Sequence, residues 1–288
     1  MPKQNIKPYR KYYFLLYFLV FLNIYILKGH GQSLLWRISS EDLKSSSYLY
    51  GTIHVKDKRA FEFNDSVLSA FEKCNATALE VDLSAENIVQ VAQKMILPDG
   101  LTLDSLFTPE EYQIIKSVVE EATGMDISLF NRLKPISLLS LVLNFKFAND
   151  MDVSVDEYFY RKAKEHDKQV IGIETIDEQL EVLENIPTEF VVEFFKNIEQ
   201  AEEDFEQIII LYRSAELEKL LKLMQKDKAM VMLQEDLLVN RNIKMTARIS
   251  KLIHEQSTFI AVGAGHLPGK KGIISLLTEA GYNLEPVK

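Results

Sequence analysis

Short apolar runs near both ends of the chain indicate β-strands buried in a sheet. Three lie early and three lie late: 34–39, 47–55, 76–84, 169–174, 258–265 and 282–287. Runs this short and this apolar are typical of strands whose sheet is covered on both faces. Residues 64–73 place Val67, Leu68 and Phe71 at helical spacing between two of the early runs, which predicts a strand–helix–strand unit. A last helix is expected over 271–280, with Gly281 just past its end.

The middle of the chain, from about 101 to 256, is expected to be helical. Thr108-Pro109-Glu110-Glu111 has the residues that start a helix, and Gly124 would end it. Capping boxes are expected at Ser154-x-x-Glu157 and Thr175-x-x-Glu178. The stretch 187–256, which has no glycine and no proline after its first residue, indicates three or four long helices. The predicted fold is therefore α/β, with a mixed, mostly parallel central sheet built from both chain ends and a large helical segment inserted between them.

Residues 1–31 differ from the rest and are expected to be a signal peptide or a membrane anchor. Basic residues come first, an apolar run covers 12–27, and small and polar residues follow in KGHGQS. The run is shorter than the roughly 20 residues that span a bilayer comfortably. The leader predicts an exported protein that is periplasmic, on the cell surface or secreted, with membrane contact only if it is retained. The remaining domain would cover 32–288.

Composition narrows the class of protein. The chain has 288 residues, of which 47% are hydrophobic and 26% charged, as expected of a globular domain. Its formal net charge of −9 argues against a nucleic-acid partner, because phosphate binding needs a basic surface. The single cysteine, Cys74, excludes an internal disulfide and a cysteine-based zinc site. None of these features indicates the oligomeric state.

Two glycine-x-x-histidine motifs follow apolar runs at opposite ends of the chain. Gly51-x-x-His54 ends one run and Gly263-x-x-His266 ends another. Ligands of open α/β sheets bind outside the carboxyl ends of the strands, so two such motifs at equivalent positions predict one shared site. The alternative is a pair of strand-end histidines with ordinary hydrogen bonds.

A carboxylate pair follows another apolar run. Glu80 and Asp82 are two residues apart, so in a strand they would face the same side. A carboxylate in an apolar strand is costly unless it is paired or binds a metal. Two histidines and a carboxylate form a familiar ligand set for a divalent ion that polarises a carbonyl and acidifies a bound water. A salt bridge at the sheet edge remains the alternative for Glu80.

Two further residues are open to either a structural or a functional interpretation. Glu174 ends the run 169–174 and either supports the next helix N-terminus or belongs to the site. Arg241 lies on a predicted helix, where it would face solvent or bind a carboxylate or oxyanion at the site. Because strand ends lie at a sheet rim, substitutions at the candidate site are expected to leave stability largely intact.

At these residues the sequence resembles the TraB/PrgY/GumN family, whose animal relatives are the Tiki proteins. The resemblance runs from LLWRIS to the C-terminus and is carried by SYLYGTIHV, ALEVDL, GIETIDEQL, VNRN and FIAVGAGHLPGKKGIISLLTEAGY. It implies a Tiki-like metalloprotease site at His54, Glu80 and His266, with Arg241 as a candidate helper. Some bacterial members are described as binding or inhibiting pheromones.

We therefore expect an exported metal-dependent hydrolase of the peptidase type, with a peptide or small molecule as substrate. His54, Glu80 and His266 would hold a divalent ion such as zinc, manganese or cobalt, and Glu80 and Arg241 would act in catalysis. Whether Glu80 is a ligand or a general base stays open at this point. The alternative is a non-catalytic protein that sequesters a peptide or small molecule in the same cleft.

The leader gives the first testable prediction. If residues 1–31 direct export and are removed, the mature chain should begin near Gln32. Mass spectrometry of the purified protein's N-terminus would measure this. An intact Met1 on protein from a soluble cytoplasmic fraction would contradict it.

Overall fold

The computed structural model describes residues 33–147, 150–225 and 235–288. The predicted leader, 1–31, lies outside these residues. Within the described ranges, no helix is both long enough and apolar enough to cross a membrane.

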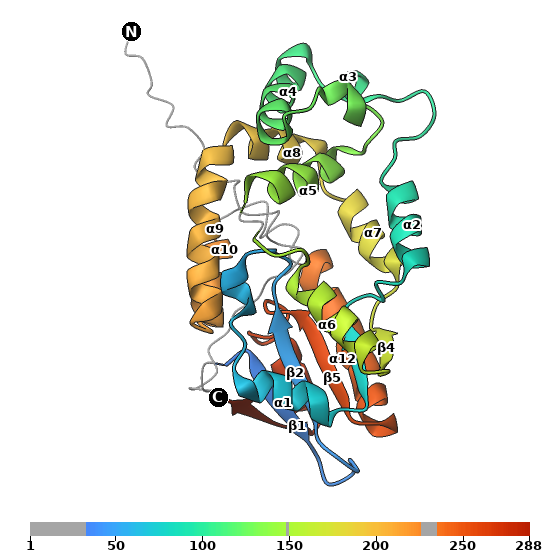
Figure 1. The fold of residues 1–288 in the computed structure, drawn as a ribbon, viewed down its shortest axis with the longest axis vertical. Helices are drawn as coiled ribbons and strands as arrows, with labels where there is room; N and C mark the ends of the chain where they lie inside the picture. Colours follow the sequence, from blue (N-terminus) through green and yellow to red (C-terminus); the bar gives the residue numbers. More distant parts are fainter. Residues whose placement is uncertain (1–32, 148–149, 226–234) are drawn as a thin grey trace.

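A six-stranded sheet forms the base of the molecule (Figure 1). Its order is β4-β3-β5-β2-β1-β6, so strands from the two ends of the chain are interleaved, with β2 and β1 as the one neighbouring pair from the same end. Neighbouring pairs among β4, β3, β5 and β2 are parallel, whereas β1 is antiparallel to both of its neighbours. The strands are β1 Leu35–Ser39, β2 Ser47–Thr52, β3 Ala76–Leu79, β4 Gln169–Gly172, β5 Thr258–Gly263 and β6 Asn283–Val287.

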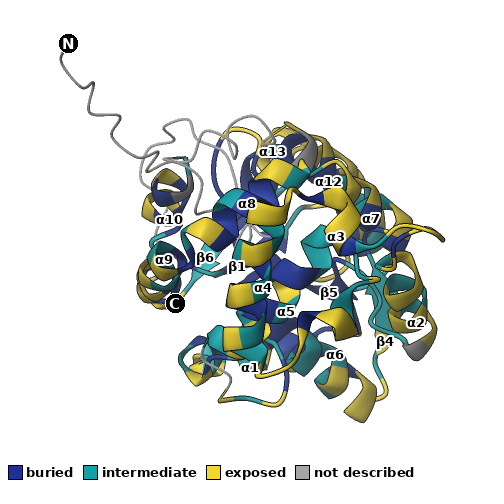
Figure 2. Cartoon of the chain, turned by 90° about the horizontal axis from the view of Figure 1, so that it is seen from above, coloured by how far each residue is buried: buried dark blue, intermediate teal, exposed yellow. Residues whose placement is uncertain are grey.

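Helices cover both faces of the sheet, and each carries buried as well as exposed residues (Figure 2). Helices α1 and α6 lie on one face, and α12 and α13 lie on the other. These helices are α1 Asp65–Lys73, α6 Val155–Glu165, α12 Asn240–Glu255 and α13 Ile273–Glu279. The arrangement confirms the predicted mixed α/β sheet made from both ends of the chain.

The other helices stand above the carboxyl ends of the parallel strands (Figure 1). They are α2 Ala85–Lys94, α3 Leu103–Leu106, α4 Pro109–Thr123, α5 Pro135–Lys146, α7 Ile176–Glu184, α8 Thr188–Lys196, α9 Ile198–Arg213 and α10 Leu217–Met224. Of the short turns, the 3-10 turn η2 Lys58–Phe61 lies between β2 and α1, and the 3-10 turn η3 Ile127–Phe130 lies between α4 and α5. The π-helical turn η4 Glu235–Val239 directly precedes α12. The predicted helical insertion is thus present, interrupted by β4 and α6.

Aromatic side chains fill the core between the sheet and α6. Phe159 of α6 lies 4.9 Å from Phe259 of β5 and 5.5 Å from Tyr50 of β2, measured between ring centroids. Phe159 and Phe259 are fully buried, and each such ring removes a large apolar area from water. This packing holds α6 rigidly against the strands that carry the two glycine-x-x-histidine motifs.

Most of the predicted helix signals are confirmed. Thr108 and Glu111 form a reciprocal capping box, as do Thr175 and Glu178. Gly124 has a φ of 68° and Gly281 a φ of 96°, so both occupy the left-handed conformation predicted at helix ends.

Three local expectations are wrong. Ser154 caps α6 alone, because the Glu157 carboxylate pairs with Arg161. Strand β3 ends at Leu79, so Glu80 and Asp82 lie in the loop after the strand rather than within it. Strand β4 is only partly buried because it is the edge of the sheet and pairs with β3 alone.

Arg248 connects α12 to α7 and to the segment that follows β4. Its guanidinium donates to both carboxylate oxygens of Glu178, at 2.7 and 2.8 Å, and to the carbonyl of Ile173 at 2.8 Å. Hydrogen bonds from Arg248 lower the pKa of Glu178 to about 2. The ionised form of Glu178 is therefore favoured by the folded state.

This pair predicts an acid-dependent loss of stability. Because the folded pKa lies below the ordinary 4.5, the contribution is fully present above pH 4.5 and is lost as the pH falls toward 2. Since both side chains are partly exposed, we expect only about 0.5–1 kcal/mol. Urea unfolding of wild type and Glu178→Gln should differ at pH 6 and converge near pH 2. A constant difference across this range would contradict the assignment.

Candidate functional site

Parallel pairing of β2 with β5 brings the two motifs together. Gly51 lies opposite Val262 and Thr52 opposite Gly263, so both strands end at the same level. A side chain at Gly51 would place its Cβ only 2.9 Å from Cα and Cβ of Ala264. Glycine is thus required at this position for the close approach of the two histidine-bearing segments.

His266 is buried and its ring orientation is fixed. Asn242 of α12 donates through Nδ2 to the carbonyl of Lys271 at 2.8 Å, so its Oδ1 faces Nδ1 of His266 at 2.5 Å. Nδ1 therefore carries the proton, and Nε2 has a free lone pair. Nε2 is buried with no hydrogen-bond partner among the described residues. Burial, reinforced by the charge of Arg241, keeps the pKa of His266 well below its usual value, so the ring is neutral.

His54 lies at the cleft surface, with 38% of its side chain exposed. Its Nδ1 is 2.7 Å from Oδ2 of Asp156, the second residue of α6. Removal from water lowers the pKa of His54, but the neighbouring Asp156 charge outweighs this effect and raises the pKa to about 9. Like His266, His54 uses Nδ1 for a protein contact. Unlike His266, its raised pKa means that Nε2 carries a proton at neutral pH, which a bound metal ion would have to displace.

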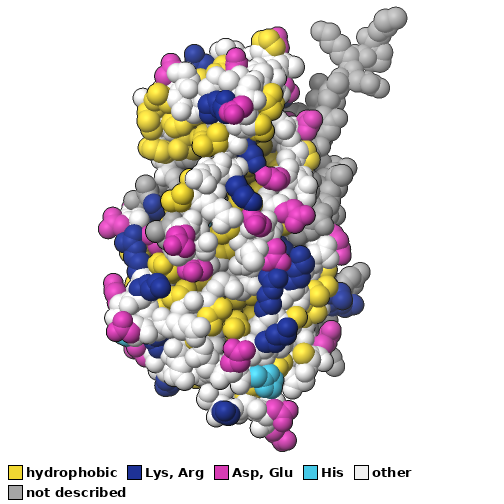
Figure 3. All heavy atoms as spheres, turned by 90° about the vertical axis from the view of Figure 1, so that its right-hand side faces the viewer, with side chains coloured by type: hydrophobic (Ala, Val, Ile, Leu, Met, Phe, Trp, Pro, Cys, Tyr) yellow, Lys and Arg dark blue, Asp and Glu magenta, His cyan; other side chains and the backbone are white. Residues whose placement is uncertain are grey.

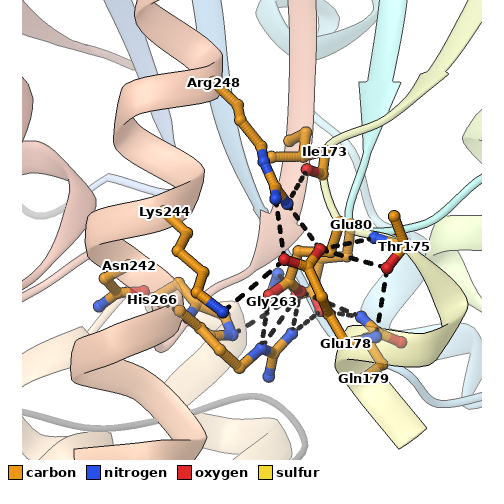
Figure 4. A network of polar contacts seen from close by, with 12 residues as sticks. Glu80, Ile173, Thr175, Glu178, Gln179, Asn242, Lys244, Arg248, Gly263 and His266 are labelled. Carbon is orange, nitrogen blue, oxygen red and sulfur yellow. Dashed lines mark hydrogen bonds and ion pairs between the residues drawn. The ribbon is translucent and has the colours of Figure 1, made fainter. Parts of the chain in front are cut away.

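Glu80 is the centre of a buried polar network (Figure 4). Its Oε2 accepts from Arg241 at 2.8 Å, and its Oε1 accepts from the backbone N–H of Gly263 at 2.7 Å. Oε1 also lies 3.7 Å from Nε2 of His266. The Arg241 guanidinium binds a second carboxylate, Glu174, at 2.5 to 3.1 Å. Gln179 donates to both carboxylates.

The structure brings Glu80, Arg241 and His266 into one network and places His54 beside it. Glu174 and Arg241 are buried members of this network rather than solvent-facing residues. Asp156 was not singled out from the sequence, although its position at the start of a capped helix was visible there. Asn242, the residue after Arg241, was not predicted to belong to the site, yet it orients His266.

A cleft of about 470 Å³ opens beside the network. Its polar floor includes His54, Glu80 and Arg241, and its walls are mainly apolar side chains from the helical segment. They include Leu143, Phe147, Val182, Leu183 and Phe205. On the side of the molecule shown in Figure 3, hydrophobic side chains gather over the upper, helical part, while charged side chains are interspersed below.

The donor set fits a divalent ion in chemical type. Both imidazoles present Nε2, and the outer partner of each ring is the kind that orients metal-ligating histidines. In the described part of the chain, however, no three His, Cys, Asp or Glu side chains are gathered closely enough to hold a metal.

Comparison with known proteins identifies the family of the chain. A family model described as the TraB/PrgY/gumN family matches residues 34–286. The chain is 24% identical to "Metalloprotease TIKI1" of Danio rerio and 23% identical to "Metalloprotease TIKI2" of the same species, each over 88% of this chain. It is 22% identical to "Metalloprotease TIKI homolog" of Nematostella vectensis over 84% of this chain.

These relatives are longer than this chain, and the matches cover 63%, 60% and 65% of their lengths respectively. No solved structure matches the chain.

Burial of the network changes the expectation that site substitutions leave stability intact. Glu80 is 3% exposed, Arg241 5% and His266 0%, so these side chains belong to the interior rather than to an open rim. Removing one partner of a buried ion pair leaves an uncompensated charge.

We therefore predict that Arg241→Ala destabilises the fold by about 3–5 kcal/mol, because Glu80 and Glu174 lose their shared cation. Urea unfolding monitored by circular dichroism would measure the loss. Arg37→Ala is the matched control, because Arg37 pairs with Glu285 on the exposed surface and should cost much less. Equal effects of the two substitutions would show that the buried network adds no stability.

Proposed function

We propose that this chain, which belongs to the TraB/PrgY/gumN family, is a metal-dependent hydrolase that cleaves peptides. One observation carries the proposal. Two histidines from opposite ends of the chain turn their Nδ1 atoms to protein partners and keep Nε2 available beside a buried carboxylate and a cleft. The names of the Tiki relatives support a protease.

His54, His266 and Glu80 are the residues that would hold the ion, which we expect to be zinc, manganese or cobalt. When bound, such an ion polarises a carbonyl and acidifies a water molecule. Arg241 donates to Oε2 of Glu80 and so fixes the direction of the carboxylate. Oε1 of Glu80 is directed toward His266 and is the atom suited either to ligate or to accept a proton from water.

The walls of the cleft suit a peptide. Apolar side chains from the helical segment can bind substrate side chains and exclude water from the polar floor. A peptide substrate also suits the export expected from the N-terminal segment. We place the protein outside the cytoplasm, either secreted, periplasmic or held at the membrane by that segment.

A second candidate is a binding protein that uses the same cleft without catalysis. The observation that favours it is the state of Glu80, whose two oxygens already accept from Arg241, Gln179 and Gly263. A carboxylate held in this way can serve as a fixed part of a binding floor. The two functions differ in whether a bound peptide is cut.

Removal of either histidine should abolish both metal binding and cleavage. His54→Ala and His266→Ala each delete a ligand, so we expect losses in kcat/KM beyond the roughly 100-fold that outer partners of a metal site cost. Metal content measured by mass spectrometry and cleavage of a peptide library would test this. His254→Ala, at an exposed histidine of α12, is the matched control and should change neither.

Glu80→Gln separates the two roles of this residue. Loss of both metal and activity would identify a ligand, whereas loss of activity with metal retained would identify a general base. A wild-type protein that binds no divalent ion, together with a His54→Ala variant that cleaves normally, would refute the metallohydrolase. Peptide binding without cleavage would establish the binding protein instead.

A further inference from the structure

We infer that Asp156 is a positioning residue that holds the His54 ring by its Nδ1 side and so directs Nε2 to the cleft. The inference rests on the proposed function only for the role of His54 as a metal ligand. The contact itself is a property of the fold, with Oδ2 of Asp156 2.7 Å from Nδ1 of His54. Oδ2 has no other partner among the described residues, so His54 is the one group it serves.

Asp156 is itself fixed before it meets His54. It is only 6% exposed, and its Oδ1 accepts a 2.6 Å hydrogen bond from Oγ1 of Thr52. It is the second residue of α6, where the positive end of the helix dipole favours a carboxylate. Thr52 in turn is the last residue of β2, two positions before His54. The Asp156 carboxylate therefore contacts both the first and the last residue of the segment 52–54 and fixes its conformation.

The two histidines differ in how much help they need. His266 is fully buried, and packing together with a neutral amide of Asn242 is enough to hold it. His54 is 38% exposed and follows the end of its strand, so neither packing nor the sheet fixes its ring. A charged partner makes a stronger hydrogen bond than a neutral one, which accounts for a carboxylate at the exposed ring.

The fold alone does not explain a buried carboxylate at this position. Burying an ionised carboxylate is costly unless it is paired. Asp156 contacts the His54 side chain, whereas Glu157, the next residue of α6, pairs with Arg161 along the helix surface. Thr52, the N-terminus of α6 and His54 together offset the cost of burying Asp156, and of these His54 is the group that lines the cleft.

The test uses full-length protein, with Co²⁺ as probe because its visible absorption reports coordination. Asp156→Asn keeps the shape but removes the charge, and should weaken Co²⁺ binding by about 10–100-fold. Asp156→Ala should weaken it further, and Thr52→Val should have a smaller effect in the same direction. Asp152→Asn, an exposed carboxylate four residues earlier, is the matched control and should bind as wild type. Urea unfolding would identify any variant that fails to fold.

A second measurement needs no metal. In proton NMR of the histidine-labelled chain, the Nδ1–H of His54 should be protected from exchange with water in wild type and unprotected in Asp156→Ala. Wild-type Co²⁺ affinity in Asp156→Asn, or a protected Nδ1–H in folded Asp156→Ala, would overturn the positioning role. If wild-type protein binds no Co²⁺, the metal-dependent function fails, and the NMR comparison alone decides the role of Asp156.

Discussion

The parallel pairing of β2 with β5 is the constraint on which the rest of the site depends. These strands are separated by most of the chain, yet Thr52 and Gly263 end them side by side. A Cβ at Gly51 would collide with the backbone of Ala264, so the approach depends on the absence of a side chain. Because the histidines lie three residues after the two glycines, a shift in register between the strands would separate the rings. The site therefore forms only when the two ends of the chain have paired.

Charge is the second constraint on the site, and it acts where the ends of β3 and β4 meet α12. Glu80 follows β3, Glu174 follows β4 and Arg241 is the second residue of α12, so three segments meet in one buried network. Two carboxylates around one guanidinium are held by hydrogen bonds that leave little freedom to move. The π-helical turn η4 ends at Val239, directly before Asn240 and Arg241. Such turns change which face of a helix a residue occupies and are frequent at functional sites.

Much of this could be predicted from local sequence. Apolar runs located all six strands, and capping residues located the starts of α4 and α7, because these signals depend on a few neighbouring residues. The burial of β4 was mispredicted because an apolar run does not indicate its place in the sheet order, and β4 is an edge strand. Asp156 was missed for a related reason. Its partner His54 lies about a hundred residues away, and an acidic residue in the first turn of a helix is expected without any function.

The position of Asp156 also connects the helical insertion to the chemistry of the sheet. Helix α6 interrupts the insertion and packs on the strands through Phe159, three residues after Asp156. Three residues along a helix return to nearly the same face, so the apolar anchor and the carboxylate both point at the sheet. Packing of Phe159 therefore fixes where α6 lies on the strands, and with it the position at which the Asp156 carboxylate contacts Thr52 and His54. In this fold the hydrophobic core beneath α6 and the orientation of a cleft histidine are consequences of one helix placement.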